Sequence, residues 1–153
     1  MNTLAVRLWS FQNVFFLWLA KPSVVQLNDA GCVIRIPLNW RTRRRDIHAM
    51  YLGVLCMGAD VAAGLPAFDL VRRRKVRVSF IFKDIKAEFL KRAEGDVHFT
   101  NEDGPLIQSL IDRALSSGVR EEATVRVTAT VPAKLGTEAV ARFELTLSIK
   151  ART

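Results

Sequence analysis

A stretch of almost uninterrupted small and apolar residues, HAMYLGVLCMGADVAAG, occupies positions 48–64. It contains no proline and does not alternate, so its length and composition predict a helix from about His48 to Ala63. Gly64, with Pro66 two residues on, is typical of a helix C-terminus. Because a helix that is apolar all round is usually buried, the remaining segments must cover it.

Most of the remaining chain has the pattern of β-strands. Two β-branched runs within 23–38 are separated by turn-forming residues at 28–31, and VRVSFIF at 76–82 continues past a break at Lys83 and Asp84. The segment around Val97 and Phe99 turns back, and two long alternating strands follow at 123–131 and 139–150. Between the segment at Val97 and Phe99 and these two strands, a short helix at 105–118 is predicted. We expect one of its faces to point inward: Leu106, Ile107, Leu110, Ile111 and Leu115. This α+β order predicts a sheet around one helix, in a single domain over 1–153.

Residues 1–21 are predicted to form an amphipathic helix. Leu4, Leu8, Phe11, Phe15 and Leu19 recur at helical spacing, and we expect this stripe to pack on the domain. Polar residues interrupt the apolar run, which is too short for a membrane span and lacks a cleavage site, so neither a secretory signal nor a transmembrane segment is expected. The large aromatic residues Trp9, Phe15, Phe16 and Trp18 leave a membrane-surface or acyl-capping role open.

The chain carries a net charge of +8 and has a sequence pI near 10.2, which favours anionic partners. Nucleic acid is the least favoured of these, because aromatic residues are not interleaved with the basic runs. Cys32 and Cys56 form no metal-binding or redox motif, so free thiols, no metal and a reducing, cytoplasmic location are expected.

The order of elements, together with the segments around residues 48–64 and 78–99, resembles the hotdog fold. The likeness covers about residues 22–151 and is closest to thioesterases of the phenylacetate-degradation type and a related subfamily of uncharacterised hotdog proteins. It implies a curved antiparallel sheet around one long helix, a homodimer or tetramer, and an acyl-thioester site between subunits. The N-terminal helix at 1–21 is an addition to this core.

The thioesterase motif of that family reads approximately H-G-G-x-x-x-x-x-A-D, with the final acid acting as base or nucleophile. The likeness aligns Asp60 with this acid and Gly53 with the second glycine, while Tyr51 and Leu52 replace the histidine and the first glycine. Arg45 lies where many members have an asparagine. The implied catalytic residues are therefore Asp60, Gly53 and Tyr51, with Leu52, Cys56 and Met57 in contact with substrate.

Asp60 has two interpretations from its chemistry alone. A buried carboxylate in an apolar helix destabilises the fold by roughly several kcal/mol unless it is paired or protonated, so its presence calls for a partner or a function. It lies on a stripe of small residues with Gly53, Cys56 and Gly64, where a ligand can approach closely. Asp60 is therefore either half of an ion pair with an arginine or a general base that activates water. His48 is a weaker candidate base.

Two arginine-rich segments, at 41–45 and 72–77, flank the predicted helix. Arg45, Arg73 and Arg74 are candidates to bind the phosphates of coenzyme A, since guanidinium groups make bidentate contacts with phosphate. A solvated basic rim is the alternative. The resemblance, together with these features, implies hydrolysis of an acyl-coenzyme A or acyl-carrier thioester with no separate cofactor, and the competing hypothesis is a non-catalytic protein that binds an acyl chain or lipid.

Overall fold

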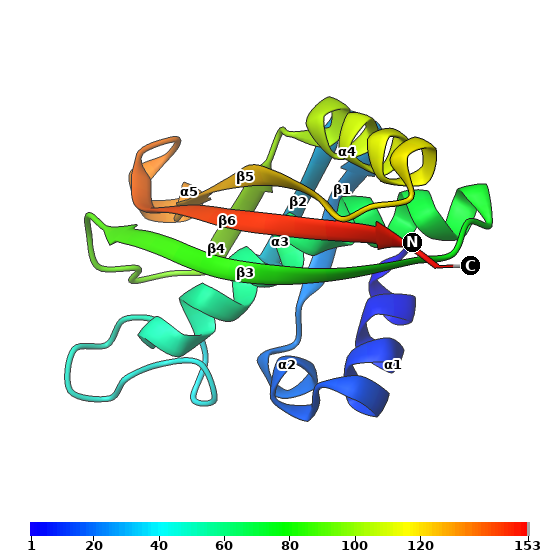
Figure 1. Cartoon of the computed structure of the whole chain (residues 1–153). Coiled ribbons are helices and arrows are strands. Elements are labelled where there is room, and N and C mark those ends of the chain that lie inside the picture. The colour runs from blue at the N-terminus through cyan, green and yellow to red at the C-terminus, as the bar shows by residue number, and fades with distance from the viewer. Residues whose placement is uncertain (153) are drawn as a thin grey trace.

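The computed structural model describes residues 1–152 and places a sheet of six strands around one long helix, in agreement with the α+β prediction (Figure 1). The strands are β1 (Ser23–Asn28), β2 (Gly31–Ile36), β3 (Val78–Phe89), β4 (Val97–Asn101), β5 (Glu121–Thr130) and β6 (Ala139–Ala151). The helices are α1 (Thr3–Asn13), α2 (Phe15–Ala20), α3 (Leu52–Arg74), α4 (Gly104–Ser117) and α5 (Pro132–Leu135).

The sheet is antiparallel throughout, with the order β1-β2-β4-β5-β6-β3. The predicted turn at 28–31 joins β1 to β2, and the side chain of Asn28 caps it by accepting from the backbone N–H of Ala30 and Gly31. The predicted break after Phe82 is a bulge in the β3–β6 ladder. β4 does not pair with β3 but lies between β2 and β5, so β3 forms one edge of the sheet.

α3 is longer than predicted, and its expected end at Gly64 is wrong. The helix passes through Pro66, whose missing N–H leaves the Ala62 carbonyl without its usual partner. The Asn101 side chain donates to that carbonyl at 2.8 Å and the Cys32 thiol at 3.2 Å. Two strands therefore replace the lost helical hydrogen bond, and the helix ends only at Lys75, in a left-handed conformation with φ 53°.

The start of α3 is also later than the predicted His48. Arg43 and Met50 form an isolated β-bridge, and the Tyr51 N–H donates to the Thr42 carbonyl at 2.8 Å. These contacts hold Met50 and Tyr51 outside the helix, after a segment of turns and bends at 45–49. Tyr51 takes the N-cap position with no side-chain hydrogen bond to the first turn.

The core lies between α3 and the concave face of the sheet. α3 contacts β2, β4, β5 and β6, and its small residues permit a close approach. At Gly58 an added Cβ would lie 2.2 Å from the Phe99 ring, so only glycine fits over this buried aromatic side chain. α3 is long and apolar enough to cross a membrane, but 61% of its most apolar stretch is buried within the fold, as expected of a core helix.

α4 confirms the predicted short helix, with a shift of its inner face. Ile107, Leu110 and Ile111 are buried as expected, whereas Leu106 and Leu115 are each 37% exposed. Ala114 completes the buried stripe in place of Leu115, because the contact surface follows spacings of three and four from Ile107.

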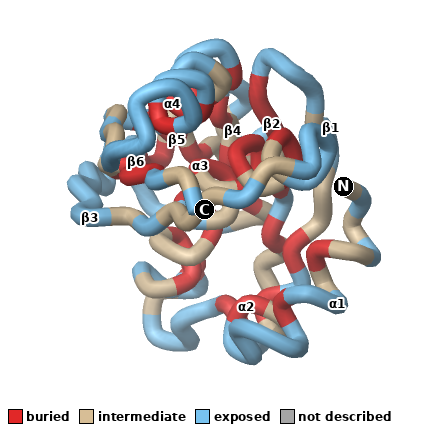
Figure 2. Tube along the Cα trace, turned by 45° about the vertical axis from the view of Figure 1, so that its right-hand side comes forward, coloured by how far each residue is buried: buried red, intermediate tan, exposed pale blue. Residues whose placement is uncertain are grey.

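The N-terminal segment forms two helices, and the prediction of its packing face was wrong. The chain breaks at Val14, and Val6, Ser10, Leu17 and Ala20 face the interior. The stripe expected to pack is turned outward: Leu4 75%, Leu8 59%, Phe11 53% and Phe15 52% exposed. Much of α1 and α2 is accordingly pale blue in Figure 2.

Polar contacts explain the orientation of α1. The Thr3 hydroxyl accepts from the Val24 N–H at 2.9 Å, and Arg7 Nε donates to the Pro22 carbonyl at 3.1 Å. The Met1 ammonium pairs with Asp69 at 2.6 Å. These partners lie on β1, on the segment before it and on α3, so they hold the polar side of the helix inward.

Candidate functional site

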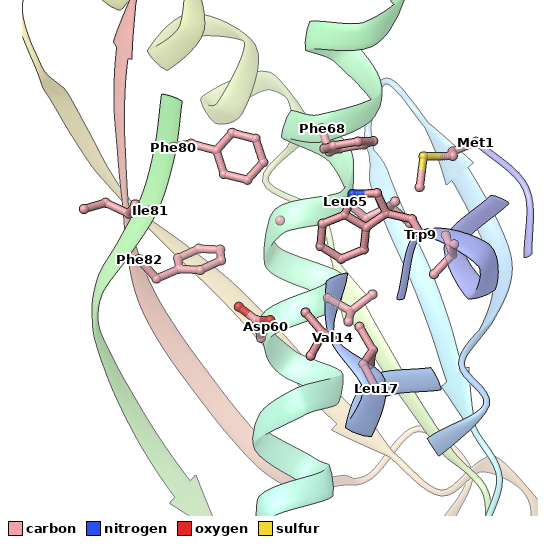
Figure 3. Close-up of a pocket in the computed structure, with 13 residues that line it drawn as sticks. Met1, Trp9, Val14, Leu17, Asp60, Leu65, Phe68, Phe80, Ile81 and Phe82 are labelled. Atoms are coloured by element: carbon pink, nitrogen blue, oxygen red, sulfur yellow. The ribbon is translucent and has the colours of Figure 1, made fainter. Parts of the chain in front are cut away.

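A cavity of about 370 Å³ lies between the N-terminal helices, α3 and β3 (Figure 3). Phe80 and Phe82 extend from β3 toward α3, and the ring of Trp9 approaches from α1. The only charged side chain in the lining is that of Asp60. The lining residues are Met1, Val6, Trp9, Val14, Leu17, Asp60, Val61, Gly64, Leu65, Phe68, Phe80, Ile81 and Phe82.

Asp60 also lines a second, more open groove. This groove, of about 470 Å³, runs over the N-terminal half of α3 past Gly53, Cys56 and Met57 to the bulge of β3 at Lys83 and Asp84. Asp60 therefore stands where an apolar cavity meets a solvent-accessible groove. This position brings it together with three of the other predicted site residues.

No hydrogen bond or ion pair within residues 1–152 involves the carboxyl group of Asp60. The residue keeps solvent access, yet burial of its carboxyl group raises its pKa above the ordinary range for aspartate. The two properties are compatible because Asp60 lines both the apolar cavity and the open groove. A partly desolvated carboxylate with a raised pKa is a stronger proton acceptor than an ordinary aspartate.

The first turn of α3 supplies backbone donors. The N–H groups of Leu52 and Gly53 lie at the helix start, where intrahelical acceptors are absent, and within the described chain neither donates to another group. The Tyr51 ring lies over Gly53, where an added Cβ would be 2.6 Å from it. Tyr51, Gly53 and Met57 also line a groove of about 600 Å³ that extends to Trp40 and Arg41.

Asp60 and the helix start are separated along α3. Asp60 lies seven positions after Gly53, which corresponds to roughly 10 Å along the helix axis. A single small group held at one of them is therefore out of hydrogen-bond reach of the other within one copy of the chain.

The predicted phosphate-binding arginines have different surroundings. Arg73 pairs with Asp29 at 2.7 Å and with Asp69 at 2.9 Å, and Arg74 pairs with Asp112 at 2.5 Å. Both lie at the far end of α3, roughly 20 Å along the axis from Asp60. The structure does not bring them together with Asp60.

Arg45 lies instead in the exposed loop before α3. Its guanidinium forms no ion pair in the described part of the chain. It is therefore the one of the three predicted arginines whose charge is not already matched by a carboxylate.

The other ionisable candidates are poorly placed for catalysis. Burial raises the pKa of Cys56 and raises that of Cys32 to about 12, so both thiols are held in their unreactive form. His48 is exposed in the loop before α3, with φ 53°, and lines neither hollow next to Asp60. In the part of the chain described here, no group of three His, Cys, Asp or Glu side chains is arranged to hold a metal ion.

Several lining residues were not identified from sequence. Phe80 and Phe82 alternate along a strand, and alternation alone does not distinguish core packing from a cavity wall. The interruption of that alternation at Lys83 and Asp84 was the available signal, since the bulge it marks borders the groove beside Asp60.

A curved antiparallel sheet around one long helix defines a hotdog-fold protein, and solved structures share this architecture. A protein of unknown function from Chlorobaculum tepidum TLS has a TM-score of 0.83 at 9% identity, covering 98% of this chain and 94% of its own. A thioesterase from Haemophilus influenzae has a TM-score of 0.69 at 12% identity, with 99% and 92% covered. A thioesterase variant from Pseudomonas aeruginosa has a TM-score of 0.70 at 12% identity, with 97% and 94% covered.

The chain belongs to the family described as Domain of unknown function (DUF4442), whose pattern matches residues 5–149. Both findings confirm the resemblance to hotdog proteins, including an uncharacterised subfamily. At these identities the solved structures establish the fold alone. No curated protein matches the sequence.

Proposed function

We propose that this protein hydrolyses an acyl thioester, with Asp60 as the general base. The observation that carries the proposal is the unpaired Asp60 carboxylate at the junction of an apolar cavity and an open groove. The cavity accommodates the acyl chain, and the groove admits the thioester and its carrier. The thioesterases of the same fold support this substrate class.

The chemistry requires one proton acceptor and a donor for the oxyanion. Asp60 removes a proton from a water molecule while the water oxygen bonds to the thioester carbonyl carbon. The carbonyl oxygen becomes an oxyanion, which accepts hydrogen bonds from backbone N–H groups such as those of Leu52 and Gly53. When the intermediate collapses, the C–S bond breaks and the thiolate takes the proton held by Asp60, which gives a carboxylic acid and a thiol and restores the Asp60 carboxylate.

The separation of the two groups favours a site shared with a second copy of the chain. The carbonyl carbon must lie about 3 Å from the water that Asp60 activates, and its oxygen about 3 Å from the N–H donors, whereas Gly53 and Asp60 of one copy are roughly 10 Å apart along α3. We therefore propose a homodimer in which Asp60 of one copy acts with the α3 start of the other. A pair of such dimers gives the tetramer.

The edge strand β3 is the candidate dimer contact. It is twelve residues long, and its apolar side chains Ile81, Ile85 and Phe89 are 55%, 47% and 43% exposed. A long apolar edge of this kind is suited to pairing with an identical strand. Ile81 lines the cavity and Ile85 the groove, so pairing at β3 brings the second copy to the site.

The phosphates of coenzyme A, or of a phosphopantetheine carrier, are assigned to Arg45. This arginine has no carboxylate partner within residues 1–152 and belongs to the same loop as Arg41, which lines the groove at Gly53. Coenzyme A is part of the substrate in this proposal, and no other cofactor is required. The cytoplasmic location stays a prediction.

A second candidate function is binding of an acyl chain or lipid without turnover. The observation that favours it is the Tyr51 ring, which covers Gly53 at the place where the thioesterase motif has a histidine followed by glycine. An apolar cavity with a single carboxylate also suits a fatty acid, since a protonated Asp60 can donate to the fatty-acid carboxylate.

The deciding experiment is release of free thiol from short, medium, long and aromatic acyl-coenzyme A substrates. The native protein is compared with Asp60→Asn and with Glu144→Gln, a matched carboxylate-to-amide change at an exposed residue of β6. We expect turnover by the native and Glu144→Gln proteins and its loss in Asp60→Asn. A native protein that is inert across the panel and carries a fatty acid through purification, detected by mass spectrometry, contradicts hydrolysis and supports the binding function.

A further inference from the structure

The outer face of α1 and α2 is an apolar surface that nothing within the described chain covers. Leu4, Leu8, Phe11 and Phe15 follow one side of the two helices, and Phe16 beside them is 72% exposed. Scattered exposed apolar residues are ordinary, but a contiguous row of this size marks an interaction surface. We call these five residues the outer apolar face.

Trp18 stiffens this face. Its ring lies 5.3 Å from that of Phe11 and 5.5 Å from that of Phe15, measured between ring centroids. Phe15 and Phe16 are also in contact, with centroids 6.5 Å apart. The aromatic side chains thus form a connected cluster at the surface, where large apolar groups are already ordered before any partner arrives.

A cationic loop borders the outer apolar face. Trp40, 71% exposed, and Arg41 line one groove together with Phe16 and Leu19, and the Arg41 guanidinium lies 4.9 Å above the Trp40 ring. Figure 1 places this loop, α1 and α2 on the same lower side of the molecule, opposite α4. Aromatic and cationic side chains therefore share one surface.

The charge of this surface is almost entirely positive. The first 45 residues contain a single carboxylate, Asp29, against seven cationic side chains. In the loop, Asp46 pairs with Arg44, whereas Arg41, Arg43 and Arg45 form no ion pair in the part of the chain described. The surface is thus complementary to a partner with closely spaced negative charges.

These features identify the occupant. A second copy of this chain has a net charge of +8 and presents no matching acidic surface in its own first 45 residues. A separate apolar edge for a second copy exists at β3. Exposed phenylalanine side chains on a helix, bordered by exposed tryptophan and arginine side chains of a neighbouring loop, are the composition that binds the interface of an anionic bilayer.

We infer that α1, α2 and the loop at 39–45 dock the protein onto an anionic membrane surface. The outer apolar face enters the acyl region, while Arg41 and Arg43 contact the lipid phosphates. The inner sides of the same helices contribute Trp9, Val14 and Leu17 to the cavity wall. Docking therefore brings the cavity next to a source of acyl chains. This consequence rests on the proposed function, whereas the inference of docking does not depend on it.

The test is co-sedimentation of the full chain with phosphatidylcholine vesicles made with and without phosphatidylserine. We expect binding to the anionic vesicles, little binding to the neutral ones, and release as the salt concentration rises. Phe15→Ser/Phe16→Ser should lower the partition coefficient at least about tenfold, because two large apolar groups no longer enter the bilayer. Arg41→Gln/Arg43→Gln should lower it by roughly tenfold or more.

Matched controls separate docking from general effects. Leu115→Ser/Val119→Ser removes exposed apolar groups at the end of α4, and Arg142→Gln removes an exposed charge on β6, so both should bind as the native protein does. Circular dichroism establishes that each variant is folded. Asp60→Asn should also bind normally, which keeps this test independent of thioester hydrolysis.

Three outcomes overturn the inference. One is the absence of binding to anionic vesicles at low salt, and another is equal binding by the native protein and the Phe15/Phe16 variant. The third is a native protein that does not bind vesicles, combined with a change of oligomeric state in the Phe15/Phe16 variant, measured by analytical ultracentrifugation. That result assigns the outer apolar face to a second copy of the chain.

Discussion

At the scale of single residues, Asp60 has the strongest link between environment and function. Its carboxyl group is partly desolvated next to Val61 and Phe82, and no cation among residues 1–152 pairs with it to hold it ionised. Desolvation alone favours the protonated form. A carboxylate in this condition is costly to the folded state, and the proposed hydrolysis accounts for its presence in an apolar helix, because that reaction needs a proton acceptor.

The first prediction concerns catalysis and its pH dependence. Replacing Asp60 by asparagine should lower kcat by roughly 10²–10⁴-fold, the usual contribution of a general base. Because the pKa of Asp60 is raised, native activity should fall as the pH drops through a value above the ordinary aspartate range. Steady-state thiol release measured across pH checks both points. An acid limb at the ordinary aspartate value contradicts the assigned environment.

The second prediction concerns stability. The pKa of Asp60 is higher in the folded than in the unfolded state, so the folded state binds more protons between these two values, and Asp60 is destabilising above both. Asp60→Asn should therefore increase the free energy of unfolding at neutral pH, by an amount that the solvent access of this residue keeps small.

Urea unfolding of the native and variant proteins measures this difference at several pH values. The advantage of Asp60→Asn should shrink as the pH falls through the raised pKa, because native Asp60 then becomes neutral as well. A variant that is less stable than the native protein at neutral pH indicates that the carboxylate has a stabilising partner.

At the scale of elements, the small residues of α3 have unequal roles. Gly58 touches the buried Phe99 ring so closely that a methyl group cannot be added, whereas an added Cβ at Gly64 meets Phe82 at an ordinary 3.5 Å. The same substitution at two positions of one helix should therefore have opposite effects.

The third prediction uses this pair. Gly58→Ala should destabilise the fold by roughly 1–3 kcal/mol, because the core must shift to relieve the overlap. Gly64→Ala should be neutral or stabilising by up to about 1 kcal/mol, since alanine favours the helix. Thermal and urea unfolding of the two variants measures the difference. Equal destabilisation by both would show that α3 and β3 are packed as tightly at Gly64 as at Gly58.

The same helix shows what sequence patterns predict and what they miss. Alternation along β5 and the apolar character of residues 52–63 depend on local periodicity, so the sheet and its central helix were predictable. The continuation of α3 through Pro66 was not, because it depends on Asn101 and Cys32, which reach the Ala62 carbonyl from distant strands.

The N-terminal helices illustrate a second limit. Apolar spacing predicted that Leu4, Leu8 and Phe11 face the core, since burial of apolar surface is usually decisive. The polar contacts of Thr3 and Arg7 with β1 and the segment before it fix the opposite orientation. Asp60 was identified because a lone acid in an apolar segment is visible in sequence, but its cavity is formed by α1 and β3, whose positions are set by the whole fold.

At the scale of the whole molecule, the proposed distribution of the site over two copies has the sharpest consequence. If Asp60 of one copy acts with the α3 start of the other, each dimer contains two sites and each site draws one essential group from each chain. Two different inactive variants can then restore one another, which is impossible when both groups come from the same chain.

The fourth prediction is this complementation. Gly53→Pro removes one N–H at the second position of α3, where proline is tolerated, and the exposed Tyr51 ring can move to admit it. Asp60→Asn and Gly53→Pro should each be inactive alone. When the two chains are unfolded and refolded together, about half of the random dimers are mixed, and each mixed dimer has one site with both native groups. Thiol release should recover to about one-quarter of the native specific activity.

The control for this experiment is to mix the two folded variants without refolding, which should give no recovery while the dimers do not exchange. Asp60→Asn refolded with native chains provides the reference for one altered site per mixed dimer. Inactivity of the refolded mixture, at a dimer content verified by ultracentrifugation, would place Asp60 and the N–H donors of each site on the same chain. The roughly 10 Å between them along α3 would then have to be bridged by a water molecule or by a different donor, such as Tyr51.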